Sequence, residues 1–149
     1  MPIAPPKLVA IKLDDYHARH IGRTADGRQF FLTNPFVPAN GDEAGRDFIA
    51  LYFFDTDGRF LDAHIDDLGT RDNLDLNAFQ RRYDQRVAEL GPVSYGSIEV
   101  QPFQVERFGT TFGLVPCVPE ADKDFWTVEV QPGNYMGFFE PFDSGEYYT

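Results

Sequence analysis

The pattern of apolar and polar residues along the chain is mainly that of β-strands separated by tight turns. Its clearest strand is Phe48 to Phe54, which is apolar on both faces and is therefore expected at the centre of a sheet. This strand runs into the turn sequence Asp57-Gly58, and the same pair occurs upstream as Asp26-Gly27. Because glycine adopts the positive φ that tight turns need, both sites predict β-hairpins.

The strand after the Asp57-Gly58 turn alternates between apolar and polar residues. The set predicted to point inward is Leu61, Ala63 and Ile65. The set on the opposite face is Asp62, His64 and Asp66. Successive members of a set lie about 6.6 Å apart along a strand, so three ligands from one strand seldom close on one ion. A solvated outward face is the simpler interpretation, and a metal site or a small acid–base cluster is the alternative.

One stretch has a helical period, beginning at Asp75 as N-cap and ending before Gly91-Pro92. Its apolar stripe consists of Leu76, Phe79, Tyr83, Val87 and Leu90. We therefore expect one main amphipathic helix over about 75–90, packed on the sheet. Strands on both sides of a single helix predict an α+β fold with a largely antiparallel sheet built from Asp-Gly hairpins. A length of 149 residues predicts a single domain, 1–149.

The net charge of −11 comes from two segments of the chain. Residues 55–75 carry seven Asp and two Arg, residues 120–149 carry seven acids and one Lys, and the rest of the chain is neutral. Such acidity repels nucleic acid and anionic lipid and favours a partner with a basic surface. Solubility is the plainer explanation of the same charge.

Cysteine content and hydropathy bear on the compartment. The single cysteine, Cys117, lies among apolar residues and is expected to be a small packing residue. With no disulfide framework, signal peptide or membrane-length apolar run, the sequence predicts a cytoplasmic protein that is not associated with a membrane. We expect no cofactor, because the glycines match neither of the common phosphate-binding loops.

The sequence around Asp55 and Asp57 resembles the Asp-x-Asp motif of magnesium-dependent phosphatases, in which one Asp is the nucleophile and the other a general acid. That motif ends a parallel strand, whereas alternation resumes here directly after Gly58, as in a hairpin. The twin turn has Thr24 in place of Asp55, so the turn itself is the shared element. We expect no enzymatic activity, with a hydrolase using Asp55, Asp57 and Asp62 as the minority alternative.

Two further histidines precede the first hairpin. His17 and His20 form an H-x-x-H pair just after Asp14 and Asp15, which are residue types that bind metals. No helical period brings them together, so we interpret both histidines as residues that lead into the hairpin.

The C-terminal segment mixes aromatic and acidic residues up to Thr149. Its aromatic content argues against disorder, which leaves two alternatives: a lid packed over the sheet, or Tyr and Phe anchors ringed by carboxylates. We predict that a partner would be bound by residues of both acidic segments: Asp62, His64, Asp66, Asp67, Glu140, Phe142, Asp143, Glu146, Tyr147 and Tyr148.

Several sequence pieces resemble, in the same order, a bacterial family labelled "formate hydrogenlyase regulatory protein HycA". The resemblance covers about His17 to Thr149, and the pieces are IGRTADGRQFF, DTDGR, YGSIEVQPF, FGLV and NYMGFFEPFDSGEYYT. The label implies a cytoplasmic regulator that represses the formate hydrogenlyase system by protein contact. It supplies no catalytic residues for this chain.

Together these features predict a non-enzymatic cytoplasmic protein that binds another protein through an acidic and aromatic surface. In one version the protein is a HycA-like regulator. In the other it is an acidic immunity or inhibitor protein that neutralises a basic effector such as a nuclease toxin. The oligomeric state is left open.

Overall fold

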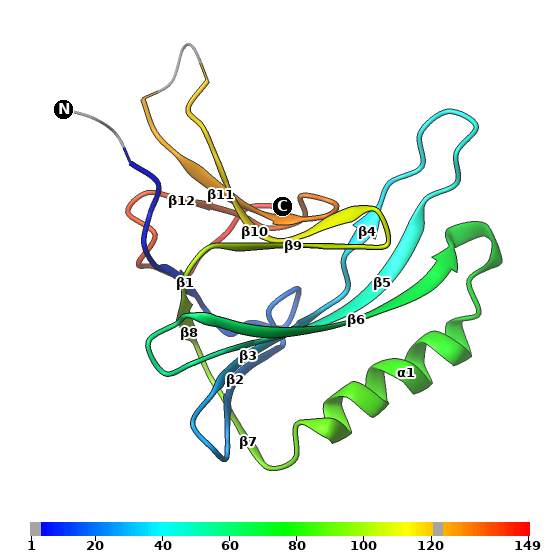
Figure 1. Ribbon diagram of the computed structural model, residues 1–149, viewed down its shortest axis with the longest axis horizontal. Coiled ribbons are helices and arrows are strands. Elements are labelled where there is room, and N and C mark those ends of the chain that lie inside the picture. The colour runs from blue at the N-terminus through cyan, green and yellow to red at the C-terminus, as the bar shows by residue number, and fades with distance from the viewer. Residues whose placement is uncertain (1–3, 121–123) are drawn as a thin grey trace.

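Two antiparallel sheets pack face to face, and one helix covers the outer face of the larger sheet (Figure 1). The computed structural model describes residues 4–120 and 124–149. Within these ranges the fold is mostly antiparallel strand with a single α-helix, so the predicted α+β class is confirmed.

The larger sheet has the strand order β4-β5-β3-β2-β7, and β6 also pairs with β5. Its strands are β2 (His20–Thr24), β3 (Gln29–Thr33), β4 (Phe36–Val37), β5 (Arg46–Phe54), β6 (Phe60–Thr70) and β7 (Val93–Tyr95). The smaller sheet has the order β12-β11-β10-β9. Its strands are β9 (Phe103–Arg107), β10 (Thr110–Cys117), β11 (Thr127–Gln131) and β12 (Gly137–Phe139). A third, two-stranded sheet pairs β1 (Val9–Ile11) with β8 (Ile98–Val100).

Strand β5 divides the hydrophobic interior into two cores. Phe48, Ala50, Tyr52 and Phe54 face the smaller sheet and join the core between the sheets. The intervening residues Ile49, Leu51 and Phe53 face the helix and join a second core. Both faces of β5 are buried, which confirms the central position predicted from its apolar sequence.

The two Asp-Gly sequences form hairpin turns of the same geometry. Gly27 and Gly58 both have φ of +89°, which only glycine adopts at little cost. In each turn the first residue donates its amide to the carbonyl of the residue four positions on, at 2.8 Å from Thr24 to Arg28 and 2.9 Å from Asp55 to Arg59. The predicted hairpins are therefore confirmed.

Strand β6 departs from the predicted alternation close to its first residue, Phe60. Phe54 pairs with Phe60, but Phe53 pairs with Asp62, so a β-bulge leaves Leu61 without a partner. The Leu61 side chain is 50% exposed, and its predicted inward orientation is wrong. Beyond the bulge, Ala63 and Ile65 pack against the core between the sheets, as predicted.

Helix α1 (Leu76–Glu89) follows a short 3-10 helix, η1 (Arg71–Asn73). The Asp75 side chain caps α1 by accepting hydrogen bonds from the amides of Asn77 and Ala78 at 2.9 and 3.1 Å. The stripe residues that pack on the sheet are Phe79, Tyr83, Val87 and Leu90. Leu76 is exposed, because the contacts of the stripe begin one helical turn later.

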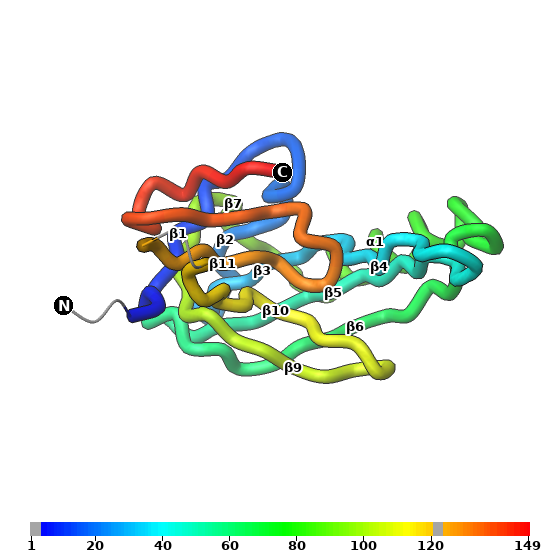
Figure 2. Tube along the Cα trace, turned by 90° about the horizontal axis from the view of Figure 1, so that it is seen from above, coloured from blue at the N-terminus to red at the C-terminus, as the bar shows by residue number. Residues whose placement is uncertain are grey.

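The C-terminal segment, residues 140–149, lies beside β1 and closes the molecule (Figure 2). The amides of Ala10 and Lys12 donate to the carbonyls of Phe142 and Gly145 at 2.9 and 3.0 Å. Gly137 and Tyr148 exchange two backbone hydrogen bonds of 2.9 and 3.1 Å. The two ends of the described chain thereby form one wall of the fold.

Candidate functional site

A groove of about 620 Å³ lies where the C-terminal segment meets the connection between β1 and β2. We call it the C-terminal groove. The residues that define it are Lys12, Leu13, Asp14, Tyr16, Phe139, Glu146, Tyr147 and Tyr148. The groove thus joins segments from opposite ends of the chain.

Asp14 and Tyr147 hold the two walls of this groove together. The Tyr147 hydroxyl donates to Asp14 Oδ2 and accepts from the amide of His17 at 3.1 Å. Asp14 Oδ1 accepts from the amides of Tyr16 and Ala18, both at 2.9 Å. Burial, together with the bond to Asp14, raises the pKa of Tyr147 to about 12. Burial also acts to raise the pKa of Asp14, but its hydrogen bonds, first that from Tyr147, lower it overall.

The rim of the C-terminal groove is aromatic and acidic. Tyr16 and Tyr148 are 63% and 51% exposed, and the Tyr148 ring stacks on that of Phe139 with centroids 5.9 Å apart. Glu146 lines the groove, and Glu140 and Asp143 are exposed in the same C-terminal segment. No ion pair in the described part of the chain includes any of the three. Exposed aromatic rings beside uncompensated carboxylates are characteristic of a surface that binds a basic partner.

The predicted partner residues of the C-terminal segment fall into three groups. Glu140, Asp143, Glu146 and Tyr148 are exposed, and Tyr147 is half-buried. Phe142 is only 8% exposed and belongs to the core between the sheets, so its predicted role as a surface anchor is wrong. Its backbone hydrogen bond to Ala10 draws the chain inward at this point, which the local sequence does not reveal.

The predicted acidic residues of β6 are largely engaged within the chain. Arg86 of α1 binds Asp66 through two hydrogen bonds of 2.7 and 3.0 Å. Arg46 pairs with Asp67 at 2.5 Å. The face expected to be solvated is therefore partly covered by the helix. Asp62 and His64, whose Oδ2 and Nε2 atoms lie 3.0 Å apart, remain nearer the surface.

Asp55 serves the hairpin turn that contains it. Its Oδ1 accepts hydrogen bonds from the amides of Asp57 and Arg59, both at 2.9 Å. The strand before it is antiparallel to its neighbours, unlike the parallel strand that precedes the phosphatase motif. Among the residues described, no cluster of three or more His, Cys, Asp or Glu side chains is placed to hold a metal ion.

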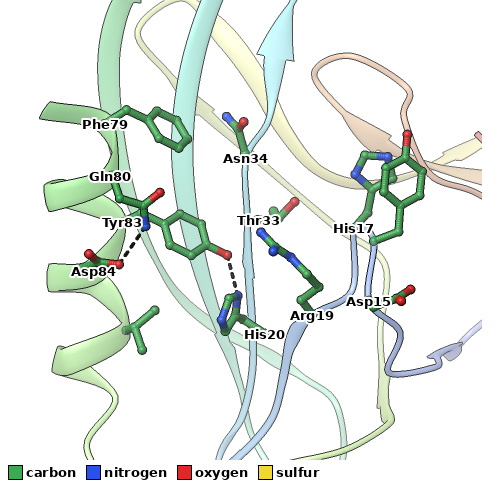
Figure 3. A pocket seen from close by; sticks show the side chains of 12 residues that line it. Asp15, His17, Arg19, His20, Thr33, Asn34, Phe79, Gln80, Tyr83 and Asp84 are labelled. Carbon is green, nitrogen blue, oxygen red and sulfur yellow. Dashed lines mark hydrogen bonds between the residues drawn. The ribbon is translucent and has the colours of Figure 1, made fainter. Parts of the chain in front are cut away.

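A second groove, of about 590 Å³, lies between α1 and the loop that leads into β2 (Figure 3). We call it the polar groove. The residues that define it are His17, Arg19, His20, Asn34, Phe79 and Tyr83. The Tyr83 hydroxyl lies 2.6 Å from His20 Nδ1 and ties the helix to the sheet. Sequence reasoning missed this site, although the H-x-x-H spacing and a tyrosine within the helix stripe were its visible components.

Burial controls protonation in the polar groove. It lowers the pKa of His17 and of His20, and the charge of Arg19 lowers both further, although Asp14 acts in the opposite direction on His17. Burial also raises the pKa of Tyr83 to about 12. At neutral pH the groove therefore presents neutral imidazoles and a neutral phenol beside one guanidinium, and the side chains of Asp15 and Asp84 also line it.

We expect stability to fall as the pH is lowered from about 8 to about 5. The pKa values of His17 and His20 lie below their ordinary value of 6.5 in the folded protein, so the unfolded chain binds more protons in this range. Thermal unfolding at a series of pH values tests this, and the double variant His17→Gln, His20→Gln should give a flatter profile. A profile as steep as that of the unchanged protein would contradict it. Asp14 affects stability in a different pH range. Its pKa is lowered in the folded protein, so the ionised carboxylate stabilises the fold, and this contribution is lost only below about pH 4.

Comparison with known proteins gave no match among protein-family models, curated proteins or solved structures. No helix within the described ranges has the length and apolar character that crossing a membrane requires.

Proposed function

We propose that this protein is a non-enzymatic cytoplasmic regulator that binds a partner protein through the C-terminal groove. The observation that carries the proposal is the combination of exposed Tyr16, Phe139 and Tyr148 rings with three carboxylates that form no ion pair in the described chain. Aromatic anchors supply most of the binding energy in protein interfaces, and rim charges steer association. The resemblance to the HycA family supports regulation by protein contact.

The net charge favours a second version of the same proposal. A chain of net charge −11 whose acids gather in two segments suits the capture of a strongly basic effector, as immunity proteins do for nucleases. Both versions require a basic surface on the partner. They differ in the partner's identity, which neighbouring genes for a hydrogenase or for a toxin would indicate.

The proposed surface can be tested by site-specific crosslinking in the native host. A photoreactive amino acid at Tyr148 should capture one defined protein, whereas the same group at Leu76, exposed on α1 and remote from the groove, should not capture it. With the purified partner, Tyr148→Ser should weaken binding by about tenfold or more, and Leu76→Ser should leave it unchanged. Equal effects of the two serine variants would contradict the proposed surface.

The electrostatic part of the proposal predicts the kinetics of association. The on-rate should fall by about tenfold between low and high salt, because screening shortens the reach of the acidic rim. The double variant Glu140→Gln, Glu146→Gln should reduce both the on-rate at low salt and its salt dependence. Asp42→Asn, at an exposed site in a different loop, is the charge control. An on-rate independent of salt would remove the steering argument even if binding is real.

A further inference from the structure

Arg19 is one of several Lys and Arg residues that form no ion pair in the described part of the chain, and it is the one that lines the polar groove. Arg28, Arg46, Arg71 and Arg86 all form ion pairs, whereas no ion pair in the described part of the chain includes Arg19. Its side chain extends into the polar groove toward the Tyr83 hydroxyl (Figure 3). An uncompensated guanidinium within a groove is a ready site for an oxyanion.

The groups beside Arg19 add further hydrogen-bonding capacity. His20 uses Nδ1 for the Tyr83 hydroxyl, and its other ring nitrogen is left for a ligand. His17 lies on the opposite side of Arg19, with its ring packed against those of Tyr16 and Tyr135. A neutral imidazole carries one N–H, so the hydrogen-bonded pair of His20 and Tyr83 has one free donor between its two side chains. With the N–H groups of the Arg19 guanidinium and of His17, these donors suit the three terminal oxygens of a phosphate.

The helix supplies an apolar side to the same groove. Phe79 and Val87 line it from α1 and are partly buried in the outer core. The volume of about 590 Å³ lies within the range of sites that hold small organic ligands. The ligand should therefore carry an apolar or aromatic group beside its anionic end.

We propose that the polar groove binds a small phosphate monoester, with the phosphate held by Arg19, His20 and Tyr83 and its organic group against Phe79. This site lies beyond the proposed partner-binding function and does not depend on it.

The overall negative charge of the protein does not prevent such binding. At physiological salt, charges farther than about 8 Å away are largely screened, so the nearest groups decide the local potential. Of the two carboxylates that line the groove, Asp84 accepts a hydrogen bond from Gln80 at 2.9 Å, and Asp15 lies in the exposed loop. Two effects lower the pKa of His20: burial is the larger, and the positive charge of Arg19 is the second.

A bound phosphate should couple to proton uptake by the histidines. Several charged and titratable groups surround the two imidazoles. They are Asp14, Asp15, Tyr16 and Arg19 from the loop, Tyr83 and Asp84 from α1, Tyr95 from β7, and Tyr135 and Tyr147 from the C-terminal part of the chain. A dianion among them opposes the effect of Arg19 and raises the pKa of both histidines. Binding should therefore be accompanied by proton uptake near pH 6.5, where the imidazoles of the unliganded protein are more than half neutral because their pKa values lie below 6.5.

Titration calorimetry of the whole chain with phenyl phosphate tests the site. We expect saturable binding with a dissociation constant of about 1 mM or below, and proton uptake revealed by buffers of different ionisation enthalpy. Arg19→Gln should weaken binding by about tenfold or more, which is the usual effect of removing a hydrogen bond to a charged group. Arg23→Gln removes the same charge from an exposed site on β2, outside the polar groove, and should change binding by less than about twofold.

The other outcomes of this experiment would overturn the proposal. Absence of saturable binding to the unchanged protein would exclude the site, and equal losses in Arg19→Gln and Arg23→Gln would show only general electrostatic attraction. Benzoate binding as tightly as phenyl phosphate would replace the phosphate assignment by a carboxylate site. Inorganic phosphate binding as tightly as phenyl phosphate would exclude the role of Phe79. Because Arg19 is exposed, both variants should unfold at the temperature of the unchanged protein, which a thermal melt checks.

Discussion

Gly113→Ala is expected to lower the free energy of unfolding by about 3 to 5 kcal/mol, the largest effect of any single substitution considered for this fold. Gly113 lies in β10 opposite Gln104 of β9, with φ of +143°. A Cβ atom there would lie 2.2 Å from the carbonyl oxygen of Phe103 and 3.0 Å from its carbonyl carbon. Both obstacles are backbone atoms, so β9 would have to move away from β10.

The displacement would also reach the core between the sheets. Phe103 stacks on Phe60 with ring centroids 4.4 Å apart, and this contact joins the edge strands of the two sheets. Thermal or chemical unfolding of purified variants measures the loss, and about 2 to 4 °C of melting temperature is expected for each kcal/mol. A loss of this size would leave the smaller sheet poorly formed at elevated temperature.

Substitutions at two other glycines serve as controls that distinguish the effect of the steric clash from that of backbone strain. Gly109 has φ of +68°, but a Cβ atom added there would meet no other atom within 4 Å, so Gly109→Ala should cost only about 1 kcal/mol. Gly96 has neither a left-handed φ nor a neighbour within 4 Å of such an atom, and Gly96→Ala should be neutral within about 0.5 kcal/mol. If Gly113→Ala were as stable as Gly96→Ala, the close approach of β9 to β10 would be wrong.

The features predicted correctly from sequence are those that neighbouring residues specify. Asp26-Gly27 and Asp57-Gly58 form their turns through bonds within five residues, and Asp75 caps the helix through the next three. The burial of Phe48 to Phe54 follows from its apolar sequence alone. Local propensity and pattern agree at these positions, so tertiary structure does not override them.

The wrong predictions concern positions decided by distant partners. Leu61 is exposed because β6 shifts register against β5, and alternation within β6 cannot show a bulge. Phe142 is buried because its chain segment pairs with β1, more than 130 residues earlier. The polar groove needs His20 and Tyr83 to meet across 63 residues. No pattern within either segment specifies that contact.

The two grooves share one segment of chain. Tyr16 lines both of them, and the Asp14–His17 loop between them is fixed by Asp14 and by Tyr147. The loop therefore forms part of the wall at each site. A ligand in either groove contacts the segment that shapes the other.

Arg86→Met is expected to lower the free energy of unfolding by about 2 to 3 kcal/mol, because it leaves the Asp66 carboxylate without its main partner. The two side chains are only 14% and 16% exposed, and the hydrogen bonds to Asp66 raise the pKa of Arg86. Methionine retains the length and apolar stem of arginine, so the substitution tests the charge more than the packing. Chemical unfolding measures the loss.

A neighbouring arginine distinguishes a specific buried pair from general attraction between helix and strand. Arg82 lies one turn earlier, 3.8 Å from Asp66 and 50% exposed, so Arg82→Met should cost no more than about 0.5 kcal/mol. Adding Asp66→Asn to Arg86→Met should recover part of the loss, because the isolated charge is then absent. If the two arginine variants lost the same free energy of unfolding, Asp66 would be attracted by the general positive charge of the helix and not bound specifically by Arg86. In that case it would remain available to a partner, as its place in the acidic segment first predicted.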